Sequence, residues 1–227
     1  MKIAIIAAME EEVLEIEKNL LNKEEKEVNK FKFIFGKYNS HDVIIAVSGI
    51  GKVAAAMLFT TLIQNFEGIE RVINVGVAGG VLGKTKVGDV VLADKINYHD
   101  VDLSAFTKYS YGELPNNPKE FETDFEIINI IKDSNILIGT ISTGDKFMIS
   151  KKEVSNIKKR FVKENIYAFD MESAAFAQCA YYYEIPFTCI RGISDVIGET
   201  TVSSYEYNLN IICKKIALLI IKLLEKI

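Results

Sequence analysis

Strand-like and helix-like segments alternate along the whole chain, and this alternation constrains the fold more than any other feature of the sequence. Residues 2–8 form a continuous apolar run, typical of a strand buried on both faces, and residues 10–20 follow with the apolar spacing of a helix. We expect further strands at 31–36, 42–48, 71–76, 89–96, 135–142, 166–169 and 186–191. We expect further helices at 51–65, 123–132, 150–160, 171–183 and 204–226. Strands and helices that alternate without segregation predict an α/β fold in one domain spanning residues 1–227, a three-layer αβα sandwich around a central mixed, largely parallel β-sheet.

Composition excludes several classes of protein. The 227 residues carry a formal net charge of −4, which argues against nucleic acid or an anionic membrane as the main partner. The apolar run near the N-terminus is too short for a signal peptide, and the apolar segment at 217–224 is interrupted by Lys222 and far too short to span a membrane. The three cysteines lack C-x-x-C spacing, and the two histidines, His41 and His99, are far apart. We therefore expect a cytoplasmic protein without a metal or a cofactor.

Acidic residues follow three of the predicted strands. Residues 9–12 read Met-Glu-Glu-Glu, residues 170–172 read Asp-Met-Glu, and residues 194–195 read Ser-Asp. Ligands of open α/β sheets bind outside the carboxyl ends of the strands, so these side chains are expected at one edge. An acidic residue at a helix N-terminus also interacts favourably with the helix dipole, by about 0.3–1 kcal/mol. Each carboxylate alone therefore has a structural explanation, but three at three strand ends favour a functional site.

Two glycine-rich stretches, 48–52 and 74–80, are predicted to form turns at the same edge. The first reads G-x-G-x-x-A through Ala54 and resembles a dinucleotide fingerprint. Such a site needs an acidic residue at the end of the next strand, and the strand ending at 74–76 has none. A Walker A phosphate-binding loop is also excluded, because the first glycine and a Ser or Thr after Lys52 are missing. The glycines indicate either close approach of the backbone to a ligand or tight packing of strand on helix.

Three carboxylates, a nearby Arg191 and no metal ligands suggest cleavage of a glycosidic bond. Breaking a C–N bond at a ribose passes through a state resembling an oxocarbenium ion. One group must activate water, and another must protonate the leaving group. A third carboxylate can hold the sugar hydroxyls and stabilise the developing positive charge.

Several motifs in order resemble one known family, the methylthioadenosine/S-adenosylhomocysteine nucleosidases. The motifs are AAMEEEV at 7–13, SGIGKVAAA at 48–56, NVGVAGG at 74–80, KVGDVV at 86–91, YHD at 98–100, YGELP at 111–115, STGDKF at 142–147, DMES at 170–173 and RGISD at 191–195. The similarity extends from Met1 to the C-terminal helix. It implies a fold like that of nucleoside phosphorylases and hydrolases, and hydrolysis of an adenine nucleoside as the reaction.

The same resemblance implies roles for the catalytic residues. Glu12 would activate the attacking water, with Arg191 nearby, and Glu172 would bind the 2′ and 3′ hydroxyls of the ribose. Asp195, oriented by Ser194, would protonate N7 of adenine. Methylthioadenosine and S-adenosylhomocysteine would thus yield adenine and a thioribose.

The resemblance also implies the substrate contacts. Phe147 would stack on the purine and the backbone of Met148 would read its edge, while the other contacts would come from Met9, Ile50, Val77, Ala78, Gly79, Met171 and Tyr205. Phe106 and Pro115 would come from a partner subunit to shape the alkylthio pocket, so we expect a homodimer. They lie in or beside the turn-rich stretch 107–122, and loops of that length are usually functional or at an interface. Val77 replaces a serine of many relatives and Lys146 replaces a small residue, which bears on affinity and substrate preference.

Three other functions remain open. A purine nucleoside phosphorylase would need cations and free backbone N–H groups for phosphate, whereas residues 10–12 are three glutamates. A nucleoside-binding or storage protein would have no need for Glu12, Glu172 and Asp195 together. The sequence does not distinguish a hydrolase of methylthioadenosine and S-adenosylhomocysteine from a hydrolase of another adenine nucleoside, such as aminodeoxyfutalosine. In each case the partner is a small-molecule nucleoside.

Overall fold

The computed structural model describes residues 1–131, 135–161, 165–199 and 202–227. The strands are β1 (Lys2–Ala7), β2 (Leu21–Val28), β3 (Phe31–Tyr38), β4 (His41–Val47), β5 (Arg71–Gly80), β6 (Val90–Tyr98), β7 (Phe121–Glu122), β8 (Leu137–Thr143), β9 (Ile166–Asp170) and β10 (Phe187–Val196). The helices are α1 (Glu10–Glu17), α2 (Lys52–Asn65), α3 (Phe125–Ile131), α4 (Lys151–Arg160), α5 (Ser173–Tyr183) and α6 (Val202–Leu224). Within the described ranges, no helix is long and apolar enough to cross a membrane.

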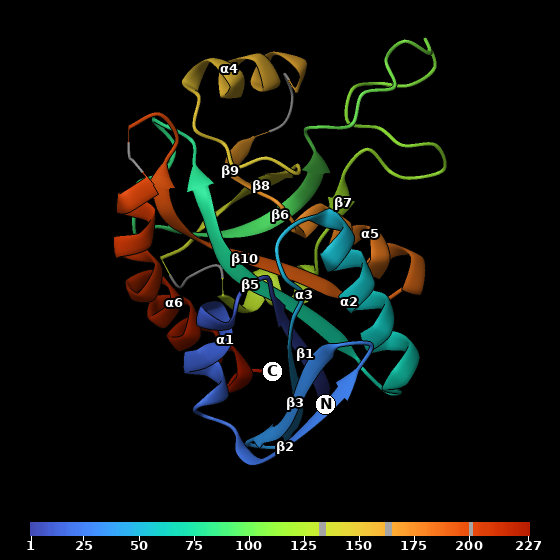
Figure 1. The fold of residues 1–227 in the computed structure, drawn as a ribbon, viewed down its shortest axis with the longest axis vertical. Helices are drawn as coiled ribbons and strands as arrows, with labels where there is room; N and C mark the ends of the chain where they lie inside the picture. Colours follow the sequence, from blue (N-terminus) through green and yellow to red (C-terminus); the bar gives the residue numbers. More distant parts are fainter. Residues whose placement is uncertain (132–134, 162–164, 200–201) are drawn as a thin grey trace.

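Helices cover both faces of the sheet, as the alternating pattern predicts. Helices α2 and α5 pack on one face, and α1, α3 and α6 pack on the other (Figure 1). Strand β1 contributes to both interfaces, because Ala4 and Ile6 belong to the first apolar cluster and Ile3 and Ile5 to the second. Successive side chains of a strand point to opposite faces, so a strand buried on both sides is apolar throughout. The predicted αβα sandwich is confirmed.

The sheet is mixed, with both parallel and antiparallel pairings of strands. Strand β1 pairs in parallel with β4 and β5, β5 with β10, β6 with β8, and β8 with β9. Antiparallel pairings add β3 and β2 at one edge and join β5 to β9 and β6 to β10. Because β5 pairs with both β9 and β10, strands β5, β10, β6, β8 and β9 close into a ring. The predicted mixed sheet is confirmed, and these antiparallel pairings lie at the β2–β3–β4 edge and at two places within the ring.

The predicted secondary structure differs from the structure in several places. The helix predicted to reach residue 20 ends at Glu17, and the next residues form the unpredicted strand β2. This strand is exposed and highly charged at the edge of the sheet, so it carries no apolar pattern. The short strand β7 was also not predicted. The stretch 74–80 is not a turn but the second half of β5, and the strand predicted at 186–191 continues to Val196.

The glycines of β5 are required by close packing and not by a turn. A Cβ at Gly76 would lie 2.7 Å from Oε1 of Glu12, and a Cβ at Gly80 would collide with Oγ1 of Thr85. Neither position has the positive φ of a left-handed turn. Strand β5 can therefore continue past its neighbours only because these side chains are absent.

Candidate active site

A cavity opens beside the carboxyl ends of β1, β5, β9 and β10. Its empty space, open mouth included, is about 580 Å³. The wall is formed by Ala8, Met9, Glu12, Ile50, Val77, Ala78, Gly79, Lys146, Phe147, Met148, Phe169, Asp170, Met171, Glu172, Ser194, Asp195 and Tyr205. These include every residue predicted for the site except Arg191, Phe106 and Pro115. Ala8, Phe169 and Asp170 also line the cavity, although the sequence did not predict them for the site.

Glu12 lies in the first turn of α1, where backbone N–H groups hold its side chain. The helix begins one residue after Met9, and the side chain of Glu12 folds back so that Oε2 accepts hydrogen bonds from N of Ala8 (3.0 Å) and Met9 (2.9 Å). Its Oε1 accepts from N of Val77 (2.9 Å). Glu10 and Glu11 are exposed, so burial distinguishes Glu12 from its neighbours. Burial raises the pKa of Glu12, while Arg191 and the three N–H groups oppose that rise.

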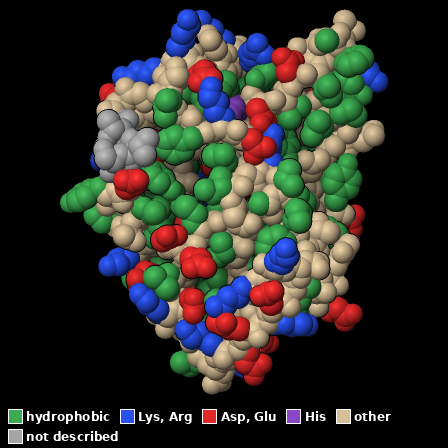
Figure 2. Space-filling view, in the orientation of Figure 1, with side chains coloured by type: hydrophobic (Ala, Val, Ile, Leu, Met, Phe, Trp, Pro, Cys, Tyr) green, Lys and Arg blue, Asp and Glu red, His purple; other side chains and the backbone are tan. Residues whose placement is uncertain are grey.

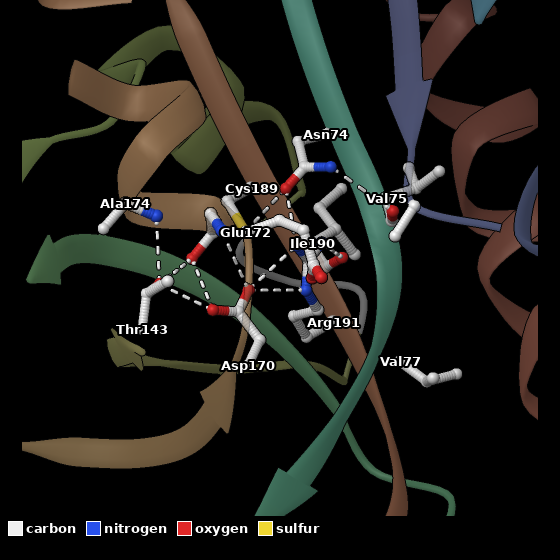
Figure 3. Close-up of polar contacts among 12 residues, drawn as sticks. Asn74, Val75, Val77, Thr143, Asp170, Glu172, Ala174, Cys189, Ile190 and Arg191 are labelled. Atoms are coloured by element: carbon white, nitrogen blue, oxygen red, sulfur yellow. Dashed lines mark hydrogen bonds and ion pairs between the residues drawn. The ribbon is translucent and has the colours of Figure 1, made fainter. Parts of the chain in front are cut away.

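Arg191 lies behind the cavity wall, where it binds Asp170 and Asn74 (Figure 3). Its Nε and Nη2 atoms are each 2.9 Å from Oδ2 of Asp170, and Nη2 is 2.6 Å from Oδ1 of Asn74. Both charged side chains are only 2% exposed. The guanidinium lowers the pKa of Glu12 and Glu172 against the effect of their burial. Arg191 therefore acts on the cavity through its charge and through Asp170, without lining the wall itself.

Glu172 is the N-cap residue of α5, and its side chain crosses to the start of α2. Oε1 accepts a hydrogen bond from N of Gly51 at 2.8 Å. Burial, with a further contribution from the charge of Asp170, raises the pKa of Glu172 to about 7, while Gly51 and Arg191 act in the opposite direction. Near neutral pH this carboxyl is therefore poised between its two protonation states.

Replacing Glu172 by Gln is expected to remove part of the pH dependence of stability. The pKa of Glu172 rises from 4.5, the ordinary value of a glutamate, to about 7 in the folded protein. Between these values the folded protein binds more protons than the unfolded chain, so the free energy of unfolding falls as pH rises. The pKa difference corresponds to roughly 3 kcal/mol. Urea unfolding at pH 5 and pH 7.5 should show a larger loss in the wild type than in Glu172→Gln, and equal losses would contradict the raised pKa.

Asp195 lies within β10, next to an irregularity in its pairing with β5. The register shifts between Ile193 and Asp195, and the side chain of Asp195 enters the cavity wall. Its Oδ1 accepts a hydrogen bond from Oγ of Ser194 at 2.9 Å, and Asn208 of α6 donates to the carbonyl of Ser194 at 3.0 Å. Burial raises the pKa of Asp195, and the Ser194 hydroxyl opposes it. A carboxyl group that holds its proton more readily suits a general acid.

The mouth of the cavity is apolar and partly open. Phe147 is 44% exposed and meets Tyr205 edge to face, with ring centroids 5.7 Å apart. The hydroxyl of Tyr205 contacts the sulfur of Met9 at 3.6 Å. An exposed aromatic face at a cavity mouth can stack on a flat ligand. The cation beside it, Lys146, forms an ion pair with Glu153 of α4.

Phe106 and Pro115 lie away from the cavity of their own chain. Both lie in the long segment between β6 and β7 that projects from the body of the molecule, and Phe106 is exposed there (Figure 1). Figure 2 shows hydrophobic side chains gathered on this projection. Within one chain, these two residues therefore do not complete the site.

The cavity suits acid–base chemistry on an organic ligand. It brings together Glu12, held by backbone donors, Asp195, whose pKa is raised by burial, and Glu172, which lies beside them in the wall. In the described part of the chain, no three His, Cys, Asp or Glu side chains are placed to hold a metal ion.

Comparison with known proteins places the chain in a family. Residues 2–225 match the family described as the phosphorylase superfamily. The 5′-methylthioadenosine/S-adenosylhomocysteine nucleosidase of Bacillus thuringiensis (strain Al Hakam) is 39% identical over 234 residues, covering 100% of each chain.

Solved structures give the same result. The MTA/SAH nucleosidase of Streptococcus pneumoniae, in complex with 8-aminoadenine, superposes with a TM-score of 0.94 at 37% identity and covers 100% of each chain. The S-adenosylhomocysteine nucleosidase of Streptococcus pyogenes, in complex with 5-methylthiotubericidin, gives a TM-score of 0.93 at 35% identity, covering 99% of this chain and 96% of that one. The chain therefore belongs to the phosphorylase superfamily and, within it, to the methylthioadenosine/S-adenosylhomocysteine nucleosidases.

Proposed function

We propose that this chain, acting as one domain, hydrolyses the N-glycosidic bond of methylthioadenosine and S-adenosylhomocysteine. The products are adenine and methylthioribose or S-ribosylhomocysteine. The observation that carries the proposal is that Glu12 and Asp195 lie in the wall of one cavity. Glu12 is held there by three backbone donors, and the pKa of Asp195 is raised. We also propose that the protein is cytoplasmic, which agrees with its three free cysteines.

The reaction follows from these two carboxyl groups. Glu12 takes a proton from water as the water oxygen bonds to C1′ of the ribose. The C1′–N9 bond breaks, and Asp195 gives its proton to N7 so that adenine leaves as a neutral molecule. Glu172 binds the ribose hydroxyls and stabilises the positive charge that develops on the sugar. Phe147 stacks on the purine, and the backbone of Met148 meets its edge.

Hydrolysis is favoured over phosphorolysis by the way Glu12 is held. A phosphate nucleophile would need cations and free backbone N–H groups. The N–H groups of Ala8, Met9 and Val77 already donate to Glu12. Among the described residues of the wall, Lys146 is the only Lys or Arg, and it is paired with Glu153. Water therefore suits this site better than phosphate.

The proposal is tested by incubating the protein with methylthioadenosine, S-adenosylhomocysteine, adenosine and aminodeoxyfutalosine, and measuring the free adenine released. Rapid release from the first two supports it. A storage protein would bind these nucleosides and release no adenine. Preferential turnover of aminodeoxyfutalosine would assign the enzyme to a different substrate.

We further propose a homodimer in which the projecting segment completes the site of the neighbouring subunit. An exposed apolar surface runs along α2 and α5 and includes Val53, Met57 and Tyr182, which are 71%, 55% and 60% exposed. It continues to Ile50, 61% exposed, at the mouth of the cavity. A second copy covering this surface would lie next to the open mouth. Apolar patches of this kind mark association surfaces.

Phe106→Ala is expected to weaken binding of methylthioadenosine more than that of adenosine. The alkylthio tail gains about 25 cal/mol for each Å² of apolar surface that it buries, and adenosine lacks this tail. Because Phe106 would act on the partner's site, mixing Phe106→Ala and Glu12→Gln subunits should restore one intact site per heterodimer. Steady-state turnover of the mixture should then exceed that of either variant alone. No recovery despite demonstrated subunit exchange, or an active monomer, would refute the shared site.

A further inference from the structure

Three segments that are distant in sequence meet at Lys52, the first residue of α2. Its Nζ atom is 2.5 Å from Oδ2 of Asp100, which follows β6, and 3.7 Å from Oδ2 of Asp145, which follows β8. The backbone N of Lys52 donates to Oδ1 of Asp145 at 2.8 Å, and the backbone N of Asp145 donates to Oδ2 of Asp100 at 2.9 Å. We call Lys52, Asp100 and Asp145 the clasp.

Asp145 of the clasp and Glu172 together replace the missing side-chain cap of α2. The residue before the helix is Gly51, with φ of +99°, and it offers no side chain to the first backbone N–H groups. Two carboxylates from other elements bind them, Glu172 at N of Gly51 (2.8 Å) and Asp145 at N of Lys52 (2.8 Å). Acidic groups are favoured at this end of a helix. The start of α2 therefore links the carboxylate proposed to bind ribose with the segment proposed to bind the purine.

In the segment proposed to bind the purine, residues 144–148, both ends are packed, because Gly144 packs on its neighbours and Met148 is buried, whereas the residues between them are exposed. A Cβ on Gly144 would lie 2.5 Å from Cε1 of His99 and 3.0 Å from Cγ of Asp100, so the segment packs directly on the end of β6. The next residue, Asp145, carries the contacts of the clasp. Two residues later, Phe147 is 44% exposed. The position of that ring therefore depends on the residues held on either side of it, with Asp145 before it and the buried Met148 after it.

We propose that the clasp positions residues 144–148 so that Phe147 and Met148 meet adenine while Glu172 holds the ribose, and that Lys52 is a positioning residue for this reaction. The inference rests on the proposed function, because it takes Phe147 and Met148 as the purine contacts. Exposed ion pairs contribute little to stability. Lys52, however, is only 23% exposed and is shared by two carboxylates. Its backbone N donates to Asp145, whose own backbone N donates to Asp100. Loss of its charge should therefore affect purine binding first.

The test measures the Kd of adenine by calorimetry, together with kcat and KM for methylthioadenosine, in Lys52→Met and Asp145→Asn. Adenine carries no ribose, so its Kd reports on the purine half alone. Asp145→Asn keeps an oxygen that can accept from N of Lys52 but loses the charge. The control is Lys37→Met, which removes an exposed Lys–Asp ion pair, to Asp42 (2.7 Å), between β3 and β4 and outside the cavity wall. Urea unfolding of each variant verifies that it is folded.

Both clasp variants should weaken adenine binding at least about threefold and raise KM in parallel. Loss of such an ion pair costs up to roughly 1 kcal/mol, which is about fivefold in affinity. Their kcat should stay within about threefold, because Glu12 and Asp195 are held by other partners. The double variant should bind adenine no more weakly than the weaker single variant. A change in adenine Kd below threefold, an equal change in Lys37→Met, or effects that multiply in the double variant would overturn the clasp. Wild-type protein that binds no adenine would instead overturn the proposed function.

Discussion

Glu12→Gln is expected to bind methylthioadenosine nearly as tightly as the wild type and to lose most of its turnover, by roughly 10²- to 10⁴-fold, as for loss of a positioned base. Gln has no site that can take a proton from water at neutral pH. It keeps the length of Glu and one oxygen, which can still accept from N of Ala8 and Met9. Single-turnover rates and the Kd of a non-hydrolysable nucleoside measure the two effects separately.

The substitution also disturbs a buried contact, so it needs a control. In Glu12→Gln the new amide nitrogen faces N–H of Val77, where Oε1 of Glu12 accepts in the wild type, and an unsatisfied buried donor costs about 1–3 kcal/mol of stability. Urea unfolding shows whether the variant is folded under assay conditions. Glu11→Gln is the matched variant, because Glu11 is exposed on the same turn. Near-normal turnover in folded Glu12→Gln, or an equal loss in Glu11→Gln, would end the role of Glu12 as base.

Asp195→Asn is expected to lose at least as much turnover as Glu12→Gln with methylthioadenosine. Asn cannot supply a carboxylic proton to N7, but it can keep the hydrogen bond from Ser194. The raised pKa of Asp195, caused by burial, is what equips the wild-type residue to hold that proton. A nucleoside whose base leaves readily without protonation should be far less affected. The measurement is kcat/KM for a good and a poor leaving group in both proteins.

The leaving-group comparison separates an acid from a structural residue. If Asp195 only supports β10, its replacement will slow both nucleosides by the same factor. Asp42→Asn, an exposed carboxylate of β4, should leave both rates unchanged. Equal losses for good and poor leaving groups in Asp195→Asn would refute its role as the acid.

Buried elements of the fold could be predicted from the sequence, whereas edge elements could not. Strand β1 is apolar on both faces because helices cover both, so its sequence alone reveals its position. Strand β2 is charged and exposed at the edge, where pairing with β3 and not burial stabilises it. The glycines of β5 suggest a turn when read locally. Their real cause is the close approach of Glu12 and Thr85, which only the folded structure brings near.

Part of the candidate site could likewise be predicted from the sequence, and part could not. The three acidic segments could be found from the order of elements, because ligands of α/β sheets bind at the carboxyl ends of strands. In the last of them, Asp195 lies inside β10 and not after it, because that strand continues to Val196. The sequence could not show which of Glu10, Glu11 and Glu12 is buried, except through the family resemblance. It also held no sign that Arg191 pairs with Asp170, because that contact joins β10 to β9 across the ring of strands. Lys52, Asp100 and Asp145 are likewise inconspicuous in sequence and meet only in the fold.

The most direct test of the central claim, that water and not phosphate attacks the ribose, is the identity of the sugar product. Purified protein is incubated with methylthioadenosine in phosphate-free buffer and in buffer with added phosphate, and the sugar is identified by mass spectrometry. The geometry of Glu12, which occupies the N–H groups that a phosphate would need, predicts free methylthioribose at the same rate in both buffers. A sugar 1-phosphate, or turnover that depends on added phosphate, would contradict it.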